Sequence, residues 1–264
     1  MLELNQIYCG DCLELMKELD DGCVDLTVTS PPYDNLRTYK GYNFDFEPIV
    51  RELFRVTKQG GVVVWVVGDA TIKGNETGTS FKQALYFKEI GFNLHDTMIY
   101  ASEKTPLTHK RYEQGFEYMF VFSKGSPITF NPKTKKNKYQ GQNCLRNGNW
   151  ASGKDNSAMR QRKGNLLIKE NGIINNIWHY KTGGGHTTKD KNAFDHPAVF
   201  PEQLAADHIT TWTNPNDIVL DPMNGSGTST KVAKKLNRRF IGFDISEEYC
   251  KIAEERLKQE ILPL

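Results

Sequence analysis

The chain has 264 residues, of which 38% are hydrophobic, and its formal net charge is only +2. This length allows one substantial α/β domain with an insertion, or two small domains. No stretch reaches the roughly 18 apolar residues of a membrane span, and the first residues lack the basic and apolar parts of a signal peptide. We therefore expect a soluble, cytoplasmic protein.

Five cysteines, at positions 9, 12, 23, 144 and 250, fit reduced thiols better than a disulfide framework. Cys9 and Cys12 have C-x-x-C spacing, which a redox pair or half of a zinc site would also show. No second pair of this kind follows, so we expect small buried thiols and no metal site.

Strands and helices alternate through the first half of the chain. The valine run over 62–67 lacks any polar alternation, as in a strand buried on both faces. In chain order, hydrophobic spacing predicts strand 6–9, helix 12–19, strand 24–28, helix 46–57 ended by residues 58–61, strand 62–67, a loop over 71–80, helix 81–90 and strands 94–100 and 118–123. Such alternation predicts a mostly parallel sheet covered by helices on both faces.

Residues 29–33, Thr-Ser-Pro-Pro-Tyr, stop the β-branched strand 24–28 abruptly. Neither proline can donate a backbone hydrogen bond, and each has its φ fixed. The carbonyls of Ser30 and Pro31 are therefore stiff acceptors beside a hydroxyl and the ring of Tyr33. Such a cluster suits a flat, amino-bearing ring, whose N–H protons meet the acceptors while Tyr33 stacks on it. A tight turn with no chemistry is the alternative.

The composition changes after residue 123. The basic residues that follow are Lys124, Lys133, Lys135, Lys136, Lys138, Arg146, Lys154, Arg160, Arg162, Lys163, Lys169, Lys181, Lys189 and Lys191. Few acids accompany them, namely Asp155, Glu170 and Asp190. With interleaved aromatic and amide side chains, this composition suits contact with a polyanion such as nucleic acid. A merely solvated, flexible insertion is the alternative.

The α/β pattern returns from residue 194. The elements expected here are helix 202–212, strand 217–220, helix 229–236, strand 239–243 and helix 247–259. Between the two strands lies the glycine-rich turn 221–228, Asp-Pro-Met-Asn-Gly-Ser-Gly-Thr, and Asp244 ends the second strand. This is the pattern of a nucleotide-binding βαβ unit, in which the final acid accepts hydrogen bonds from ribose hydroxyls.

The acid at Asp221 narrows the choice of nucleotide. A carboxylate there would repel a pyrophosphate but attract an ammonium group, which favours S-adenosylmethionine over NAD or ATP. No Walker lysine follows the glycines, which weakens the case for phosphoryl transfer.

Taken together, segments 29–33 and 221–228 resemble those of the amino-group DNA methyltransferases, which act on N4 of cytosine or N6 of adenine. The order of catalytic motif, basic region and cofactor motif resembles the β arrangement of that family. The resemblance implies an α/β, Rossmann-like S-adenosylmethionine-dependent methyltransferase fold. Its parts would be a catalytic half over 1–123, a basic target-recognition insertion over 124–192 and a cofactor-binding half over 193–264.

The resemblance also implies roles for individual residues. Ser30, Pro31, Pro32 and Tyr33 would hold the target amine and stack on a flipped-out base. The expected cofactor contacts are Asp221, Asn224, Gly225, Ser226, Gly227 and Thr228 for the methionine part, Asp244 for the ribose, Asp11 for the adenine and Phe200 of segment 196–201 for the methionine end. Asp11 could instead serve only as a helix N-cap. The residues expected to contact DNA are Arg37, Tyr39, Lys135, Lys136, Arg146, Arg160, Arg162 and Lys163.

The resemblance further implies double-stranded DNA as the partner and a place in a restriction–modification system. A separately acting cognate endonuclease and a homodimer stay open.

A serine before Pro-Pro-Tyr, followed by Arg37 and Tyr39, is more typical of cytosine-N4 enzymes, so this base is the expected target. An adenine-N6 enzyme is the nearest alternative, and a protein or RNA methyltransferase is more distant. A non-catalytic DNA-binding module and a dinucleotide oxidoreductase are the alternatives from other classes. Direct methyl transfer to the amine needs neither a cysteine nor a metal, only positioning and preorganised acceptors.

Overall fold

The computed structural model describes residues 2–32, 44–102, 112, 114–145, 150–151, 159–160, 165–183, 185–196 and 199–258. Its contacts divide the chain into a larger unit, residues 1–131 with 176–264, and a smaller unit, residues 132–175. The smaller unit is thus shorter than the basic segment 124–192. Basic composition shows that residues are exposed, but it does not show which unit they pack against. Ile128, for example, donates its backbone N–H to Gly60 of the larger unit.

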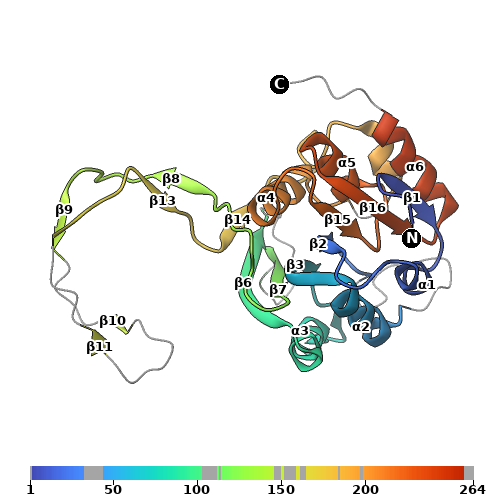
Figure 1. The fold of residues 1–264 in the computed structure, drawn as a ribbon, viewed down its shortest axis with the longest axis horizontal. Helices are drawn as coiled ribbons and strands as arrows, with labels where there is room; N and C mark the ends of the chain where they lie inside the picture. The colour runs from blue at the N-terminus through green and yellow to red at the C-terminus, as the bar shows by residue number, and fades with distance from the viewer. Residues whose placement is uncertain are drawn as a thin grey trace. The chain divides into compact units, whose positions relative to one another are not determined.

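One eight-stranded sheet forms the larger unit, in the order β1-β16-β15-β2-β3-β7-β6-β14 (Figure 1). The strands are β1 (Gln6–Cys9), β2 (Val24–Thr29), β3 (Thr57–Val67), β6 (Asn93–Ala101), β7 (Phe116–Ser123), β14 (Ile177–His179), β15 (Ile218–Asp221) and β16 (Arg239–Asp244). Strand β7 is antiparallel to both β3 and β6, whereas the other pairings are parallel. The predicted mostly parallel sheet is therefore confirmed.

Helices cover both faces of this sheet (Figure 1). On one face lie α1 (Cys12–Lys17), α2 (Phe46–Val56) and α3 (Thr79–Ile90), and on the other lie α4 (Glu202–Trp212), α5 (Thr228–Lys235) and α6 (Glu247–Lys258). A short 3-10 helix, η1 (Lys191–Asp195), precedes α4. The bounds of α4 agree with the predicted ones, because Pro201 precedes the helix and the polar turn 213–217 follows it.

The core forms where β3 meets the helices. The valines of β3 are all buried, as their lack of alternation predicted. Phe87 of α3 stacks on Phe122 of β7 with ring centroids 4.1 Å apart, and Trp65 of β3 lies 5.2 Å from Phe87. Aromatic packing of this kind fixes the sheet that carries the functional edge.

Three local predictions differ from the structure. The strand predicted over 62–67 begins earlier, at Thr57, so residues 58–61, which were predicted to end the preceding helix, belong to β3. Gly60, with a φ of 80°, lies in an irregular step within this strand. The predicted loop 71–80 contains the hairpin β4 (Thr71–Ile72) and β5 (Asn75–Glu76), and α3 already begins at Thr79. Helix α1 ends at Lys17 rather than at 19.

The smaller unit is a two-stranded ribbon, which we call the arm (residues 132–175). Nested antiparallel pairs build it: β8 (Thr134–Lys136) with β13 (Asn171–Ile173), β9 (Asn143–Leu145) with β12 (Asn165–Leu167), and β10 (Trp150–Ala151) with β11 (Met159–Arg160). An outgoing and a returning chain therefore run side by side.

Within the described residues, none of the helices has the length and apolar character that crossing a membrane requires.

Candidate functional site

The candidate site lies along one edge of the large sheet. Because β1, β16, β15, β2 and β3 are parallel, their carboxyl ends meet at this edge. Asp221 and Asp244 end β15 and β16, Ser30 directly follows β2, and Asp11 lies two residues after the end of β1. Ligands of open α/β sheets bind at this kind of edge. The fold thus brings together polar residues from both ends of the chain.

Two hydrogen bonds join the turn after β2 to the loop after β15. The Thr29 hydroxyl donates to Asp221 Oδ1 at 2.8 Å, across 192 residues of sequence. The Ser229 hydroxyl, at the start of α5, donates to the carbonyl of Val28 at 3.0 Å. Ser30 and the loop 221–228 are therefore held on neighbouring strands.

Asp221 is only 1% exposed. Burial raises its pKa to about 6, although hydrogen bonds from Ser229, Thr29 and the Met223 amide oppose the rise, and the nearby charge of Asp244 adds to it. None of the causes of this shift is a cationic side chain. A positively charged ligand would therefore favour the ionised carboxylate.

Asp244 is oriented by two backbone amides. Its Oδ2 accepts from Gly225 at 2.7 Å and its Oδ1 accepts from Ser246 at 2.9 Å. Burial raises the pKa of this carboxyl despite both bonds. Because each carboxylate oxygen can accept a further hydrogen bond, Asp244 suits ligand hydroxyls beside the loop.

The loop 221–228 needs glycine at two positions. Gly227 has a φ of 78°, and a Cβ there would lie 2.7 Å from the Cβ of Ala253. Gly225 has a φ of 48°, and a Cβ there would lie 2.9 Å from Nε2 of His196. Side chains at either position would be strained and would collide with a neighbour.

The other predicted loop residues face inward. Asn224 is buried, accepts from the Thr230 hydroxyl at 2.9 Å, and packs against Gly242 of β16. Ser226 and Thr228 are also buried. These side chains shape the loop, and their direct contact with a ligand stays a prediction.

Asp11 forms the N-cap of α1, accepting from the amides of Leu13 at 2.8 Å and Glu14 at 3.4 Å. It stands at the same edge as Asp244, because Gly10 donates its amide to the Asp244 carbonyl at 2.9 Å. Asp11 therefore caps α1, and its contact with the adenine stays a prediction.

His196 is a residue that the sequence reasoning mentioned only as part of segment 196–201. Its buried ring lies against Gly225 and 4.3 Å from the ring of Tyr249. Phe200, the contact predicted from this segment, is half-buried. The His-Pro pair before Phe200 was the available signal for His196.

The remaining predicted residues are distributed unevenly. Pro31 is buried, Ser30 and Pro32 are half-buried, and Lys135 and Lys136 are exposed on β8. Arg160 lies in β11. The predicted residues that fall outside the described part of the chain are Tyr33, Arg37, Tyr39, Arg146, Arg162 and Lys163.

The described cysteines are free thiols. Cys9 is exposed, so the expectation of a buried thiol is wrong there, because it ends the edge strand β1. Burial, together with the charge of Asp11, raises the pKa of Cys12 to about 12. A redox cysteine needs a lowered pKa, so this environment does not favour a redox pair.

Comparison with known proteins adds an independent view. The family described as DNA methylase, which groups N6 and N4 enzymes, matches residues 24–255. The chain is 57% identical over 251 residues to the orphan methyltransferase M.BamHII of Bacillus amyloliquefaciens, covering 94% of each. It is 28% identical to the type II methyltransferase M.BglII of Bacillus subtilis, covering 97% of this chain and 70% of that one.

Solved structures share the fold. The PvuII DNA methyltransferase, described as cytosine-N4-specific, has a TM-score of 0.67 at 22% identity, covering 97% of this chain and 87% of its own. A complex of M1.HpyAVI with SAM has a TM-score of 0.60 at 24% identity, covering 96% and 98%.

Proposed function

Because the chain belongs to the DNA methylase family of N6 and N4 enzymes, we propose that it methylates the exocyclic amine of a base in double-stranded DNA, with S-adenosyl-L-methionine as donor and N4 of cytosine as target. The observation that carries this proposal is the hydrogen bond between Thr29 and Asp221. It holds Ser30, the first residue of the proposed amine-binding turn, beside the proposed cofactor loop.

The acids at the sheet edge fit this cofactor. Buried Asp221 lacks a cationic partner among the described side chains and suits the positive charge of the methionine part. Asp244 suits the ribose hydroxyls, since its carboxylate accepts and is already oriented by Gly225 and Ser246. When bound, S-adenosylmethionine supplies a methyl group on a sulfonium centre. A M1.HpyAVI complex with SAM supports the assignment.

The turn after β2 prepares the amine. An exocyclic amine is a weak nucleophile because its lone pair is delocalised into the ring. In our proposal the Ser30 hydroxyl and the Pro31 carbonyl accept hydrogen bonds from its two N–H groups, which localises that lone pair on nitrogen. Tyr33 then stacks on the flipped-out base. The acceleration comes from positioning and preorganised acceptors, with no covalent bond to the protein.

Cytosine N4 is proposed on the serine that precedes Pro-Pro-Tyr and on the Arg37 and Tyr39 that follow it. The likeness of fold to the cytosine-N4-specific PvuII enzyme is compatible with this choice. Adenine N6 is the second candidate, because both bases present an amine of similar geometry and the matched family contains both kinds of enzyme.

Digestion of methylated DNA to nucleosides, followed by mass spectrometry, tests the proposal. We expect N4-methyldeoxycytidine when the purified protein acts on genomic DNA with S-adenosylmethionine. N6-methyldeoxyadenosine would change the proposed target from cytosine to adenine but would keep the proposed reaction. No methylated nucleoside, with cofactor binding demonstrated, would overturn the proposed activity.

The arm supports double-stranded DNA as the substrate. A two-stranded β-ribbon fits the major groove of B-DNA, where base edges present a distinct pattern for each pair. Residues of β8 and the flanks of β13 are exposed, and Lys135 and Lys136 supply cations for phosphate contacts. We propose the arm as the target-recognition element; a separate cognate endonuclease and a homodimer stay predictions.

A further inference from the structure

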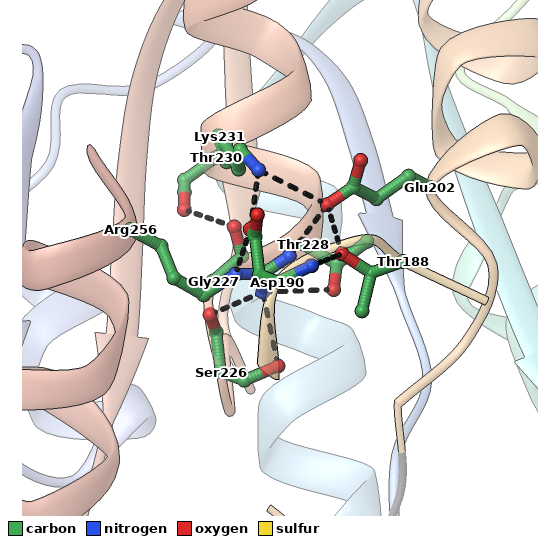
Figure 2. Close-up of polar contacts among 9 residues, drawn as sticks. All are labelled: Thr188, Asp190, Glu202, Ser226, Gly227, Thr228, Thr230, Lys231 and Arg256. Atoms are coloured by element: carbon green, nitrogen blue, oxygen red, sulfur yellow. Dashed lines mark hydrogen bonds and ion pairs between the residues drawn. The ribbon is translucent and has the colours of Figure 1, made fainter. Parts of the chain in front are cut away.

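Two acids and two bases form a charge cluster behind the loop 221–228, consisting of Asp190, Glu202, Lys231 and Arg256 (Figure 2). Arg256 Nε donates to Asp190 Oδ2 at 2.9 Å, and its Nη2 donates to Glu202 Oε1 at 2.7 Å. Lys231 contacts the same two oxygens, at 3.2 Å for Glu202. Each acid is therefore shared by both bases.

Arg256 also contacts the loop itself. Its Nη1 donates to the Ser226 carbonyl at 2.6 Å, to the Ser226 hydroxyl at 3.1 Å and to the Thr228 hydroxyl at 3.3 Å (Figure 2). The side chain of Arg256 is 0% exposed. Lys231, by contrast, donates from its ammonium group to the two acids of the cluster and, among the described residues, to no side chain of the loop. Of these two bases, Arg256 is the one that joins the acids to the loop.

The two acids flank residues 191–201, which we call the covering segment because its His196 lies against Gly225 of the loop. Asp190 precedes η1 and Glu202 begins α4, so both ends of the intervening segment are held, and this segment carries His196 and Phe200. Thr188 ties the ends together, since its hydroxyl donates to Glu202 at 2.7 Å and accepts from the Asp190 amide at 3.1 Å. His196 in turn lies against Gly225.

Hydrogen bonds decide the charge state of Asp190. Burial alone would raise its pKa, but the bonds from Lys231 and Arg256 outweigh burial and lower it. Asp190 therefore faces the two bases as a carboxylate at neutral pH. A guanidinium suits the centre of the cluster, because its planar fork can bond several acceptors at once.

We propose that Arg256 is a positioning residue of the cofactor site, which holds the loop at Ser226 and Thr228 and the covering segment at Asp190 and Glu202 in one fixed arrangement. The proposal rests on the proposed function, since it takes the loop 221–228 to bind S-adenosylmethionine. Arg256 touches neither reacting group, and its effect passes through the loop backbone. A small misplacement of binding groups is enough to cost a large factor in binding or rate.

Three single variants of the full chain test this role. Arg256→Met removes the charge and the loop contacts, Lys231→Met removes the same charge from the same acids but no loop contact, and Arg256→Lys keeps the charge but loses the fork. For each we would measure the Kd of S-adenosylmethionine by calorimetry, the Tm, and hydrogen exchange over residues 221–231 in the ligand-free protein.

We expect Arg256→Met to raise the Kd at least about tenfold, against less than about threefold for Lys231→Met, although both lower the Tm. Arg256→Lys should keep most of the Tm and still raise the Kd, with faster exchange over 221–231. A Kd that follows the Tm alone in all three variants would overturn the proposal. If Arg256→Met does not fold, the Kd and hydrogen exchange of Arg256→Lys are compared with those of Lys231→Met.

Failure of the proposed function would look different. In that case the wild-type protein would bind no S-adenosylmethionine, whereas hydrogen exchange would still report on the loop. Faster exchange in Arg256→Lys than in Lys231→Met would then support the positioning role, and equal exchange would overturn it.

Discussion

The loop 221–228 and the arm hold their shapes in opposite ways. In the loop, most side chains are buried and bonded to partners on other elements, such as Asp221 to Thr29 and Ser226 to Arg256. In the arm, backbone pairing carries the structure, and the side chains of β8 all face solvent. Among the described residues of the arm, the Asn137 side chain adds a hydrogen bond by donating to the carbonyl of Lys169 at 2.8 Å.

With the roles proposed above for the loop and the arm, this difference separates chemistry from recognition. A substitution in the loop disturbs several elements at once, because each side chain there is shared between them. A substitution in the arm leaves the ladder intact and changes only what the surface presents. The cofactor site is therefore expected to tolerate little change, whereas the recognition surface can vary without loss of stability.

The largest expected effect is on the turn beside the loop. Ser30→Ala removes one proposed acceptor for the amine, so the single-turnover rate of methyl transfer should fall about 100-fold or more, by analogy with loss of one preorganised hydrogen bond. The Kd of S-adenosylmethionine should stay within about twofold. Asp244→Asn should do the reverse, weakening cofactor binding most. An unchanged rate in Ser30→Ala would contradict the assigned role.

Gly227→Ala would sharpen the comparison through stability. The new Cβ would lie 2.7 Å from that of Ala253 at a φ of 78°, so we expect a loss of roughly 3 kcal/mol in the free energy of unfolding by urea. Gly74→Ala is the control, because its φ is 79° but nothing lies within 4 Å; it should cost about 1 kcal/mol. Gly141→Ala, equally open in the arm, should resemble that control. Equal losses of unfolding free energy at all three glycines would contradict the proposed difference between the loop and the open positions.

The pH dependence of cofactor affinity is the third test. Asp221 has a raised pKa of about 6 in the ligand-free protein, mainly because it is buried. A cationic ligand binds the carboxylate form, so below pH 6 binding must release a proton. As the pH falls below 6, the Kd of S-adenosylmethionine should therefore increase by up to about tenfold per pH unit. Asp244, whose pKa burial also raises, would add to the same slope. Calorimetry from pH 5 to 8 would measure this.

Asp221→Asn provides the control for that slope. Because the folded pKa lies above the ordinary 3.8, the contribution of Asp221 to stability is present below that value and is lost as pH rises through about 6. The Asp221→Asn variant should therefore bind S-adenosylmethionine more weakly, and its Kd should vary less with pH. Its Tm at pH 8 should be no lower than that of the wild type. An unaltered slope would assign the titration to another group.

The smallest effects belong to the arm. Lys135 and Lys136 are adjacent in β8 and so point to opposite faces of the ribbon. If one face meets DNA, a lysine-to-alanine change on that face should weaken binding about threefold and lower the salt slope by about 0.9, while the other changes little. Binding titrations at several salt concentrations would measure both. A lowered Tm in either variant would contradict the comparison.

Local patterns predicted most of the sheet and the turns that carry the site. The valines of β3, the prolines after β2 and the glycines after β15 each leave a signal in neighbouring residues. The irregular step at Gly60 was missed, because a Gly-Gly pair also marks loops. Arg256 was missed for a different reason, since its partners come from distant segments and a lone arginine in a helix has no distinguishing pattern.

The pairing of β1 with β16 has a consequence for synthesis of the protein. Among the eight strands of this sheet, β1 is synthesised before the others, and its neighbour β16 is synthesised after them, so β1 stays unpaired until the rest of the sheet has emerged. The Thr29–Asp221 bond spans a comparable length of sequence, so the edge that carries the chemistry is completed only when translation of the sheet is nearly finished. Nascent chains, and chains that end before β16, should therefore be unable to modify DNA, however long the arm has been in place.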